Sequence, residues 1–208
     1  MKRLSIFVLL TLLLTGCGIH PAVQKEVQVE AGEALSTEVT DYASLPDSIS
    51  SEDVSLYLDD VDINTPGDYD AHMTYNNKDY SFVVHVMDTV APSASRAMDY
   101  IISTPGILHA SDYVTDISDA TKITVGFVGE PQKRADLSVM NTEEIEADAA
   151  SDKTTVLFSE NSGESETSEL SADFTFEDEG IYDGQIAVQD AGNNRMVFDF
   201  TFYIDGTP

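Results

Sequence analysis

One short unit occurs twice in this 208-residue chain. Gly-x-Tyr-Asp stands at residues 67–70 and again at residues 180–183. Each copy opens a run of alternating apolar and polar residues, passes through a polar turn and returns as a second alternating run, which ends in Asp88 or Asp205. Alternation with a period of two is typical of half-buried β-strands. The repeat therefore predicts two small β-domains in tandem.

The same alternation predicts the individual strands. Residues 69–87 should form a hairpin whose turn is Asn-Asn-Lys-Asp at residues 76–79, because Asn tolerates the positive φ of tight turns. Strands are also expected at residues 122–128 and 154–158, and in a last hairpin around the turn at residues 190–194. No window of the first domain shows a convincing helical period. The predicted fold class is all-β.

Proline marks the joint between the domains. Thr-Val-Ala-Pro at residues 89–92 interrupts the strand pattern, because Pro lacks a ladder donor and biases the preceding residue toward extended backbone. The first domain is expected at residues 25–90 and the second at residues 91–208. The second domain carries an acidic insertion at about residues 141–172, where a Gly/Ser/Glu-rich composition predicts a loop.

Residues 1–16 are not expected to belong to the fold. A basic start, Lys2-Arg3, precedes an apolar core at residues 4–14 that is too short to span a bilayer permanently, which is typical of a secretory signal. The core runs into Leu-Thr-Gly-Cys at residues 14–17. This tetrapeptide resembles the lipobox of bacterial lipoproteins, Leu-[Ala/Ser/Thr]-[Gly/Ala]-Cys, at all four positions. The resemblance implies cleavage before Cys17 and acyl chains such as palmitate on its thiol and on the new amino group.

Cys17 is the only cysteine of the chain. An ordinary signal peptide that contains a Cys by chance is the alternative interpretation. With lipidation, residues 17–24 become a lipidated tether, and the protein is held at the extracytoplasmic face of a cell membrane. A lipidated Cys17 leaves no disulfide, so packed sheet cores alone have to stabilise the fold.

The chain is strongly acidic, with 38 Asp and Glu against 10 Lys and Arg and a formal charge of −28. Loss of residues 1–16 removes two of the ten basic residues and no acidic one, which takes the charge to about −30. Nucleic acids and anionic lipid surfaces bind proteins through Lys and Arg that replace counterions. The charge therefore argues against nucleic acid as a partner and favours solubility and a loose attraction to divalent cations.

The second copy of the repeat resembles a known signature. Asp-Glu-Gly-Ile-Tyr-Asp-Gly at residues 178–184 resembles the Asp-x-Gly-x-Tyr-x-Cys motif of immunoglobulin-like sandwiches. In that family the Tyr hydroxyl bonds back to upstream backbone, which makes a tyrosine corner. The resemblance assigns this structural role to Tyr69 and Tyr182. Ala71 and Gly184 stand where the second Cys would be, and the chain has no Trp, which excludes antibody-type domains but not the wider sandwich class.

Two further patterns are similar to bacterial immunoglobulin-like surface repeats. They are the turn Asp-Ala-Gly-Asn at residues 190–193 and the Asp-x-x-x-Pro ending at residues 88–92. The resemblance covers about residues 25–205 and implies two tandem immunoglobulin-like antiparallel β-sandwiches. Such domains serve as spacers, adhesins and binding modules, so the resemblance is specific for fold and weak for function.

The residues offer little for catalysis. The four histidines are scattered, and His72 and His85 alternate with the apolar positions of their hairpin, which predicts that both face solvent. The sequence has no Gly-x-Ser-x-Gly elbow, no His/Cys cluster with zinc spacing and no phosphate-binding Gly-rich loop. We therefore expect a protein that is not an enzyme.

Calcium is the one metal that the sequence suggests, because Ca²⁺ prefers several carboxylate oxygens. The two densest acidic clusters are residues 59–62 and residues 177–179 near Asp183. The candidate ligands that they supply are Asp59, Asp60, Asp62, Asp178 and Asp183. Neither cluster matches an EF-hand loop. Solvated acidic loops that oppose aggregation are the alternative interpretation. Beyond the covalent lipid on Cys17, no other cofactor is expected.

The function that these observations favour is non-catalytic. We expect a surface-anchored lipoprotein with a binding, adhesion or spacer role, attached to the membrane through its lipid and recognising a protein or a carbohydrate. An accessory or structural subunit of an envelope assembly, in particular a carbohydrate-handling one, is the alternative.

Overall fold

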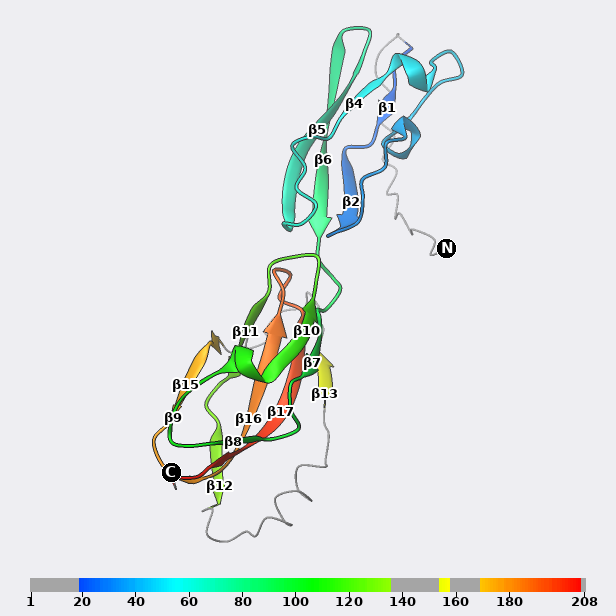
Figure 1. Cartoon of the computed structure of the whole chain (residues 1–208). Helices are drawn as coiled ribbons and strands as arrows, with labels where there is room; N and C mark the ends of the chain where they lie inside the picture. The colour runs from blue at the N-terminus through cyan, green and yellow to red at the C-terminus, as the bar shows by residue number, and fades with distance from the viewer. Residues whose placement is uncertain (1–18, 136–153, 158–168, 207–208) are drawn as a thin grey trace. The chain divides into compact units, whose positions relative to one another are not determined.

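The computed structural model describes residues 19–135, 154–157 and 169–206. The chain divides into two compact units, Met1–Asp88 and Thr89–Pro208, called unit 1 and unit 2 below (Figure 1). This division falls two residues before the boundary expected between residues 90 and 91. The described elements are β-strands together with three 3₁₀ helices of three or four residues each. The chain is all-β, as the alternation predicts.

Unit 1 is built on a four-stranded sheet in the order β2-β6-β5-β4. The strands are β2 (Glu26–Glu30), β6 (Lys78–Met87), β5 (Gly67–Tyr75) and β4 (Ser55–Tyr57). The pair β2/β6 is parallel, and the other two pairs are antiparallel. The remaining elements are a two-stranded pair, β1 (Ala22–Val23) with β3 (Ala43–Ser44), and the 3₁₀ helices η1 (Val39–Asp41) and η2 (Ser51–Asp53).

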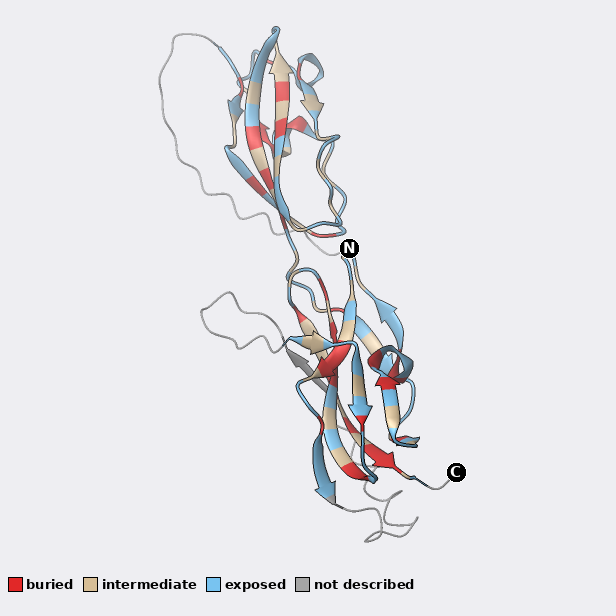
Figure 2. Ribbon diagram, turned by 90° about the vertical axis from the view of Figure 1, so that its left-hand side faces the viewer, coloured by how far each residue is buried: buried red, intermediate tan, exposed pale blue. Residues whose placement is uncertain are grey.

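The hairpin β5/β6 turns within the predicted residues 76–79, but the turn is only two residues long, because β6 already begins at Lys78. Asn76 and Asn77 occupy the two central positions with φ of 49° and 60°, the positive values that a two-residue hairpin turn requires. Along both arms every second side chain enters the core, as the buried positions of the long strands in Figure 2 show. Tyr42, just after η1, packs its ring 5.4 Å from that of Phe82 and donates its hydroxyl to the Ser36 carbonyl.

Unit 2 has a larger sheet in the order β13-β17-β16-β11-β14, with β12 added on β16 and β8 added in parallel on β17. Its strands are β13 (Thr154–Leu157), β17 (Arg195–Ile204), β16 (Gly180–Gln189), β11 (Thr124–Val128), β14 (Leu170–Ser171), β12 (Gln132–Ala135) and β8 (Ile101–Ser103). Two antiparallel pairs complete the unit, β9 (Gly106–His109) with β15 (Asp173–Phe176) and β7 (Ser93–Arg96) with β10 (Val114–Ser118). The 3₁₀ helix η3 (Ala110–Tyr113) follows β9.

One core joins the large sheet of unit 2 to the β9/β15 pair. Leu108 and Phe176 come from that pair, while Phe127, Ile186 and Phe202 come from the large sheet, and all five are buried in the same cluster. Phe202 is completely buried, and its ring centroid lies 5.1 Å from that of Phe176. Two β layers therefore face one another across aromatic side chains.

Gly184, which the sequence resemblance compares with the second Cys of immunoglobulin-like domains, is closely packed in unit 2. A Cβ atom on Gly184 would lie 3.0 Å from the Pro131 ring and 3.1 Å from the Phe202 ring. These contacts are tighter than ordinary van der Waals distances, so the neighbouring rings occupy the space that a side chain would need. The Pro131 and Phe202 rings therefore fill the space beside Gly184.

Both units repeat the same order of parts. In unit 1 the buried Tyr42 directly follows the 3₁₀ helix η1. In unit 2 the buried Tyr113 is the last residue of the 3₁₀ helix η3. An early strand, β2 or β8, lies parallel to the last strand of its unit, and the last two strands form a long antiparallel hairpin.

The tyrosine of each repeat makes the same hydrogen bond. Tyr69 donates its hydroxyl to the Thr65 carbonyl at 2.7 Å, and Tyr182 donates to the Asp178 carbonyl at 2.9 Å, in each case four residues upstream. The bond ties the loop before the strand to the strand itself. Both tyrosines also pack against the core clusters of their units.

Tyr182→Phe tests this contact by removing one hydroxyl and nothing else. We expect the free energy of unfolding to fall by about 1 kcal/mol, the usual contribution of one hydrogen bond, measured by urea denaturation. Tyr57→Phe is the control, because the Tyr57 ring is exposed and stacks on His72. Equal stability of the two variants would show that the Tyr182 hydroxyl contributes nothing.

Candidate functional site

The first cluster of predicted calcium ligands is spread along a turn. Asp59 and Asp60 are exposed residues that follow β4. Asp62 accepts hydrogen bonds from the Asn64 backbone N–H at 3.0 Å and from the Thr65 hydroxyl at 2.8 Å. These two bonds stabilise the carboxylate and lower the pKa of Asp62. Asp62 therefore has a clear role in shaping the turn before β5.

The second cluster is divided in the same way. Asp178 is exposed, and its backbone carbonyl accepts the Tyr182 hydroxyl. Asp183 lies on β16, where its Oδ2 is 3.5 Å from Nε of Arg134 and its Oδ1 accepts from the Thr201 hydroxyl. Among the described residues, none of the five predicted ligands belongs to a group of three that could share a cation.

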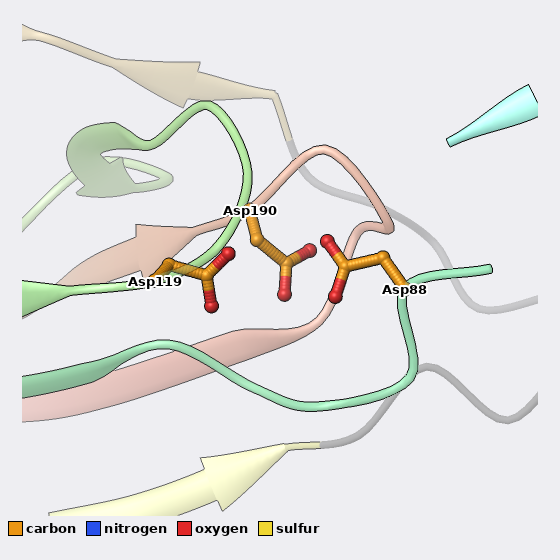
Figure 3. Close-up of side chains that lie close together, drawn as sticks. All are labelled: Asp88, Asp119 and Asp190. Atoms are coloured by element: carbon orange, nitrogen blue, oxygen red, sulfur yellow. The ribbon is translucent and has the colours of Figure 1, made fainter. Parts of the chain in front are cut away.

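A different pair of carboxylates comes together at one end of unit 2. Asp119 precedes β11, and Asp190 follows β16; these strands pair antiparallel with Thr124 opposite Gln189, so the two loops lie at the same end of the sheet. Carboxylate oxygens of Asp119 and Asp190 lie within 4.8 Å of one another (Figure 3). Figure 3 also labels Asp88, the last residue of unit 1.

Hydrogen bonds fix both loops in place. Asp190 is buried, and its two oxygens accept the backbone N–H of Asn194 at 2.8 Å and its side-chain amide at 3.0 Å. Asp119 accepts both the N–H and the hydroxyl of Thr121, and that hydroxyl in turn accepts the Ala191 N–H at 3.1 Å. Each carboxylate therefore shapes its own loop, and the Thr121 hydroxyl links the two loops. The sequence showed a turn at residues 190–194 but gave no reason to bring Asp119 beside it.

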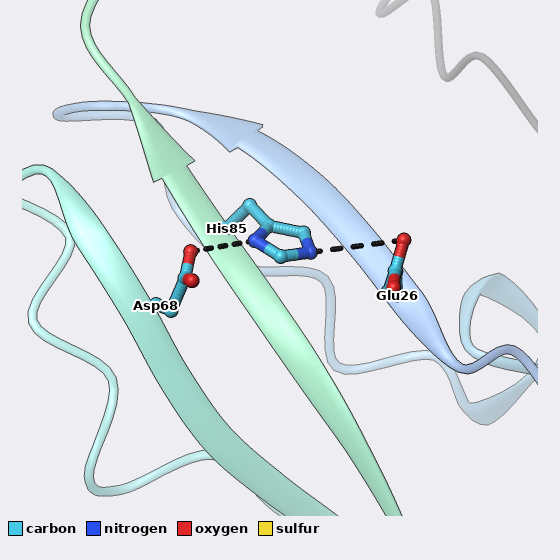
Figure 4. A network of polar contacts seen from close by, with 3 residues as sticks. All are labelled: Glu26, Asp68 and His85. Atoms are coloured by element: carbon cyan, nitrogen blue, oxygen red, sulfur yellow. Dashed lines mark hydrogen bonds and ion pairs between the residues drawn. The ribbon is translucent and has the colours of Figure 1, made fainter.

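Histidine and carboxylate side chains meet on the solvent face of the unit 1 sheet (Figure 4). His85 on β6 lies between Asp68 on β5 and Glu26 on β2. Its Nδ1 is 2.6 Å from the Asp68 Oδ1, and its Nε2 is 3.9 Å from the Glu26 Oε2. The prediction that this histidine faces away from the core agrees with the burial of Val84 and Val86 on either side of it.

Unit 2 has a simpler pair of the same kind. His109 on β9 and Asp173 on β15 are directly opposite in the ladder, with Nδ1 of His109 2.6 Å from Oδ1 of Asp173. The hydrogen bond to Asp173 and its negative charge raise the pKa of His109 above the ordinary 6.5, with a smaller contribution from the charge of Asp112. The pair links the two strands most strongly when the imidazole is protonated.

This raised pKa gives a prediction with a defined sign. The His109–Asp173 pair stabilises the fold fully below pH 6.5, and this contribution is lost as the pH rises through the higher folded-state pKa. In an NMR titration, Asp173→Asn should bring the His109 pKa down toward 6.5. A His109 pKa that does not respond to Asp173→Asn would contradict the pairing.

Three of the histidines contact an aromatic ring or a carboxylate rather than a Ser or Cys side chain. His72 stacks on the Tyr57 ring with centroids 4.6 Å apart and a 9° angle, and His85 and His109 are held by carboxylates. A triad needs a histidine bonded both to an orienting group and to a nucleophile. Across the part of the chain that the structure describes, the hydrogen bonds of the histidines include none to a Ser or Cys side chain.

Comparison with known proteins gives no family: no protein-family model matches the chain, and no curated protein matches it significantly. Within the described residues, the structure has no helix that is both long and apolar enough to cross a membrane. The lipobox and the acidic insertion lie outside the described residues, apart from short pieces of the insertion at 154–157 and 169–172.

Proposed function

We propose that this chain is a lipoprotein anchored to the extracytoplasmic face of a cell membrane, where it acts as a non-catalytic binding or adhesion module. The observation that carries the proposal is Leu-Thr-Gly-Cys at residues 14–17, placed directly after a short apolar core and containing the only cysteine of the chain. Several acyl chains on one residue give stable attachment, because each buried methylene contributes about 0.8 kcal/mol.

The proposed fold of each unit is an immunoglobulin-like sandwich. Three features support it: the last two strands form a long hairpin, an early strand runs parallel to the last one, and the repeated Tyr hydroxyl binds a carbonyl four residues upstream. In unit 2 the β9/β15 pair also covers the large sheet across a common core. Domains of this class bind through their loops and strand edges.

The net negative charge of the chain restricts the kinds of ligand that it can bind. A formal charge of −28 repels polyanions, so the proposed ligand is a neutral carbohydrate or a protein surface with basic character. The solvent face of the unit 1 sheet offers carboxylates on β2 and β5 beside the stacked Tyr57 and His72 rings, the kinds of group that bind sugars or basic side chains.

A binding test separates the two functions that the sequence allows. A soluble fragment of residues 19–208, which keeps strand β1, should bind host or matrix ligands on glycan and protein arrays, with the heat-unfolded fragment as the control. Binding that the unfolded fragment lacks supports the proposal. Failure of this binding, together with co-purification of the full chain with envelope proteins, would instead show an accessory subunit.

A further inference from the structure

His85 lies between two carboxylates at unequal distances. On β6 it is directly opposite Asp68 of β5 and beside Gln28 of β2, and Glu26 is the next residue along the same face of β2 (Figure 4). The His85 side chain is 26% exposed, whereas those of Glu26 and Asp68 are 75% and 76% exposed. The ring is therefore held by the sheet, and both carboxylates are open to water.

The short contact determines how the ring is protonated. An ionised carboxylate only accepts hydrogen bonds, so the 2.6 Å contact requires that Nδ1 of His85 carry a proton and donate it to Asp68. In the neutral imidazole, Nε2 then carries a lone pair. That lone pair faces Glu26, which also presents lone pairs.

The second contact of His85, from Nε2 to Glu26, is longer. At 3.9 Å, Nε2 of His85 and Oε2 of Glu26 are too far apart for a hydrogen bond, which needs about 2.7–3.2 Å. Zinc binds imidazole nitrogen at about 2.0–2.1 Å and carboxylate oxygen at about 2.0–2.2 Å, and a tetrahedral angle would place these atoms about 3.4 Å apart. Glu26 is exposed and has to move only about 0.5 Å to reach this separation.

We propose that Nε2 of His85 and the Glu26 carboxylate bind a zinc-type divalent transition-metal ion on the solvent face of the unit 1 sheet. Asp68 does not bind the metal; it orients the imidazole through Nδ1, as carboxylates do behind many metal-binding histidines. Two protein ligands leave the remaining positions to water or to a group of a partner molecule. The negative charge of the chain raises the concentration of cations around the protein.

The ligand type separates zinc from calcium. Imidazole nitrogen favours Zn²⁺ and its neighbours in the transition series, whereas Ca²⁺ prefers oxygen. The many surface carboxylates should attract both ions loosely, but only zinc should depend on His85. The site is distinct from the predicted calcium ligands, none of which it includes.

The test uses the full chain in detergent, titrated with zinc chloride while the imidazole signals are followed by NMR and the heat by calorimetry. Zinc should shift the His85 signals, and His85→Gln or Glu26→Gln should weaken this binding at least about tenfold. Asp68→Asn should weaken it about 10- to 100-fold, the usual effect of losing an orienting carboxylate. Calcium chloride should leave the His85 signals in place.

His72→Gln is the matched control, because His72 lies on the same face of the same sheet and stacks on Tyr57. It should bind zinc as the unchanged chain does. A zinc affinity that His85→Gln leaves unchanged, or His85 signals that do not move at millimolar zinc, would overturn the proposal. All of these substitutions are at solvent-facing positions, and unchanged melting temperatures would confirm that each variant folds.

Discussion

Replacing Cys17 with alanine is expected to abolish fatty-acid labelling of the protein and to remove it from the membrane fraction. The thiol is the only one in the chain, so no other side chain can take its place. Each methylene of an acyl chain contributes about 0.8 kcal/mol of membrane binding, and loss of all chains removes the whole anchor. Metabolic labelling with palmitate, followed by detergent phase partition, measures both effects.

Gly16→Ala is the matched control, because the lipobox pattern accepts Ala as well as Gly before the Cys. This variant should be labelled and anchored as the unchanged chain is. Labelling of the Cys17→Ala protein, or an unchanged chain that carries no fatty acid, would contradict the anchor. In that case the apolar start would be an ordinary signal peptide, and the binding role at a membrane surface would lose its main support.

Alternation predicted the strands well because it reports which side of a strand is buried. The β5/β6 hairpin with its Asn76-Asn77 turn and strand β11 lie where the pattern placed them, and β13 covers residues 154–157 of the expected 154–158. Each of these predictions depends on neighbouring residues alone, and local sequence carries that information.

Long-range pairing could not be predicted in the same way. Strand β9 pairs with β15 more than 60 residues later, and β8 lies parallel to β17 about 100 residues later. Alternation says that a strand has a buried face but not which strand lies beside it. The His109–Asp173 and Glu26–His85 contacts depend on such pairings, so the sequence did not reveal them.

The calcium prediction shows a related limit. It selected carboxylates that are close in the sequence, yet adjacent side chains of a turn or a strand point in different directions. Asp62 bonds to its own turn, whereas Asp119 and Asp190, 71 positions apart, have oxygens within 4.8 Å. Density of acidic residues along the chain is therefore a poor guide to density in space.

Phe202→Ala should strongly destabilise unit 2. Phe202 is completely buried, and four aromatic rings surround it: Phe176 at 5.1 Å, Phe127 at 5.9 Å, Phe200 at 6.2 Å and Tyr113 at 6.5 Å. Removing a buried Phe ring loses its transfer free energy and leaves a cavity, which together cost about 3–5 kcal/mol. No disulfide is available to offset this loss, because the chain has a single Cys.

A loss of this size is a large share of the roughly 5–15 kcal/mol that stabilises a typical domain. The melting temperature of unit 2 should fall by about 10 °C or more, measured by differential scanning calorimetry. Ile102→Ala is the control, since Ile102 is 63% exposed on the neighbouring strand β8 and its truncation should change stability by less than about 0.5 kcal/mol. If the two variants melted together, the ring of Phe202 could not be at the centre of the packing between the β9/β15 pair and the large sheet.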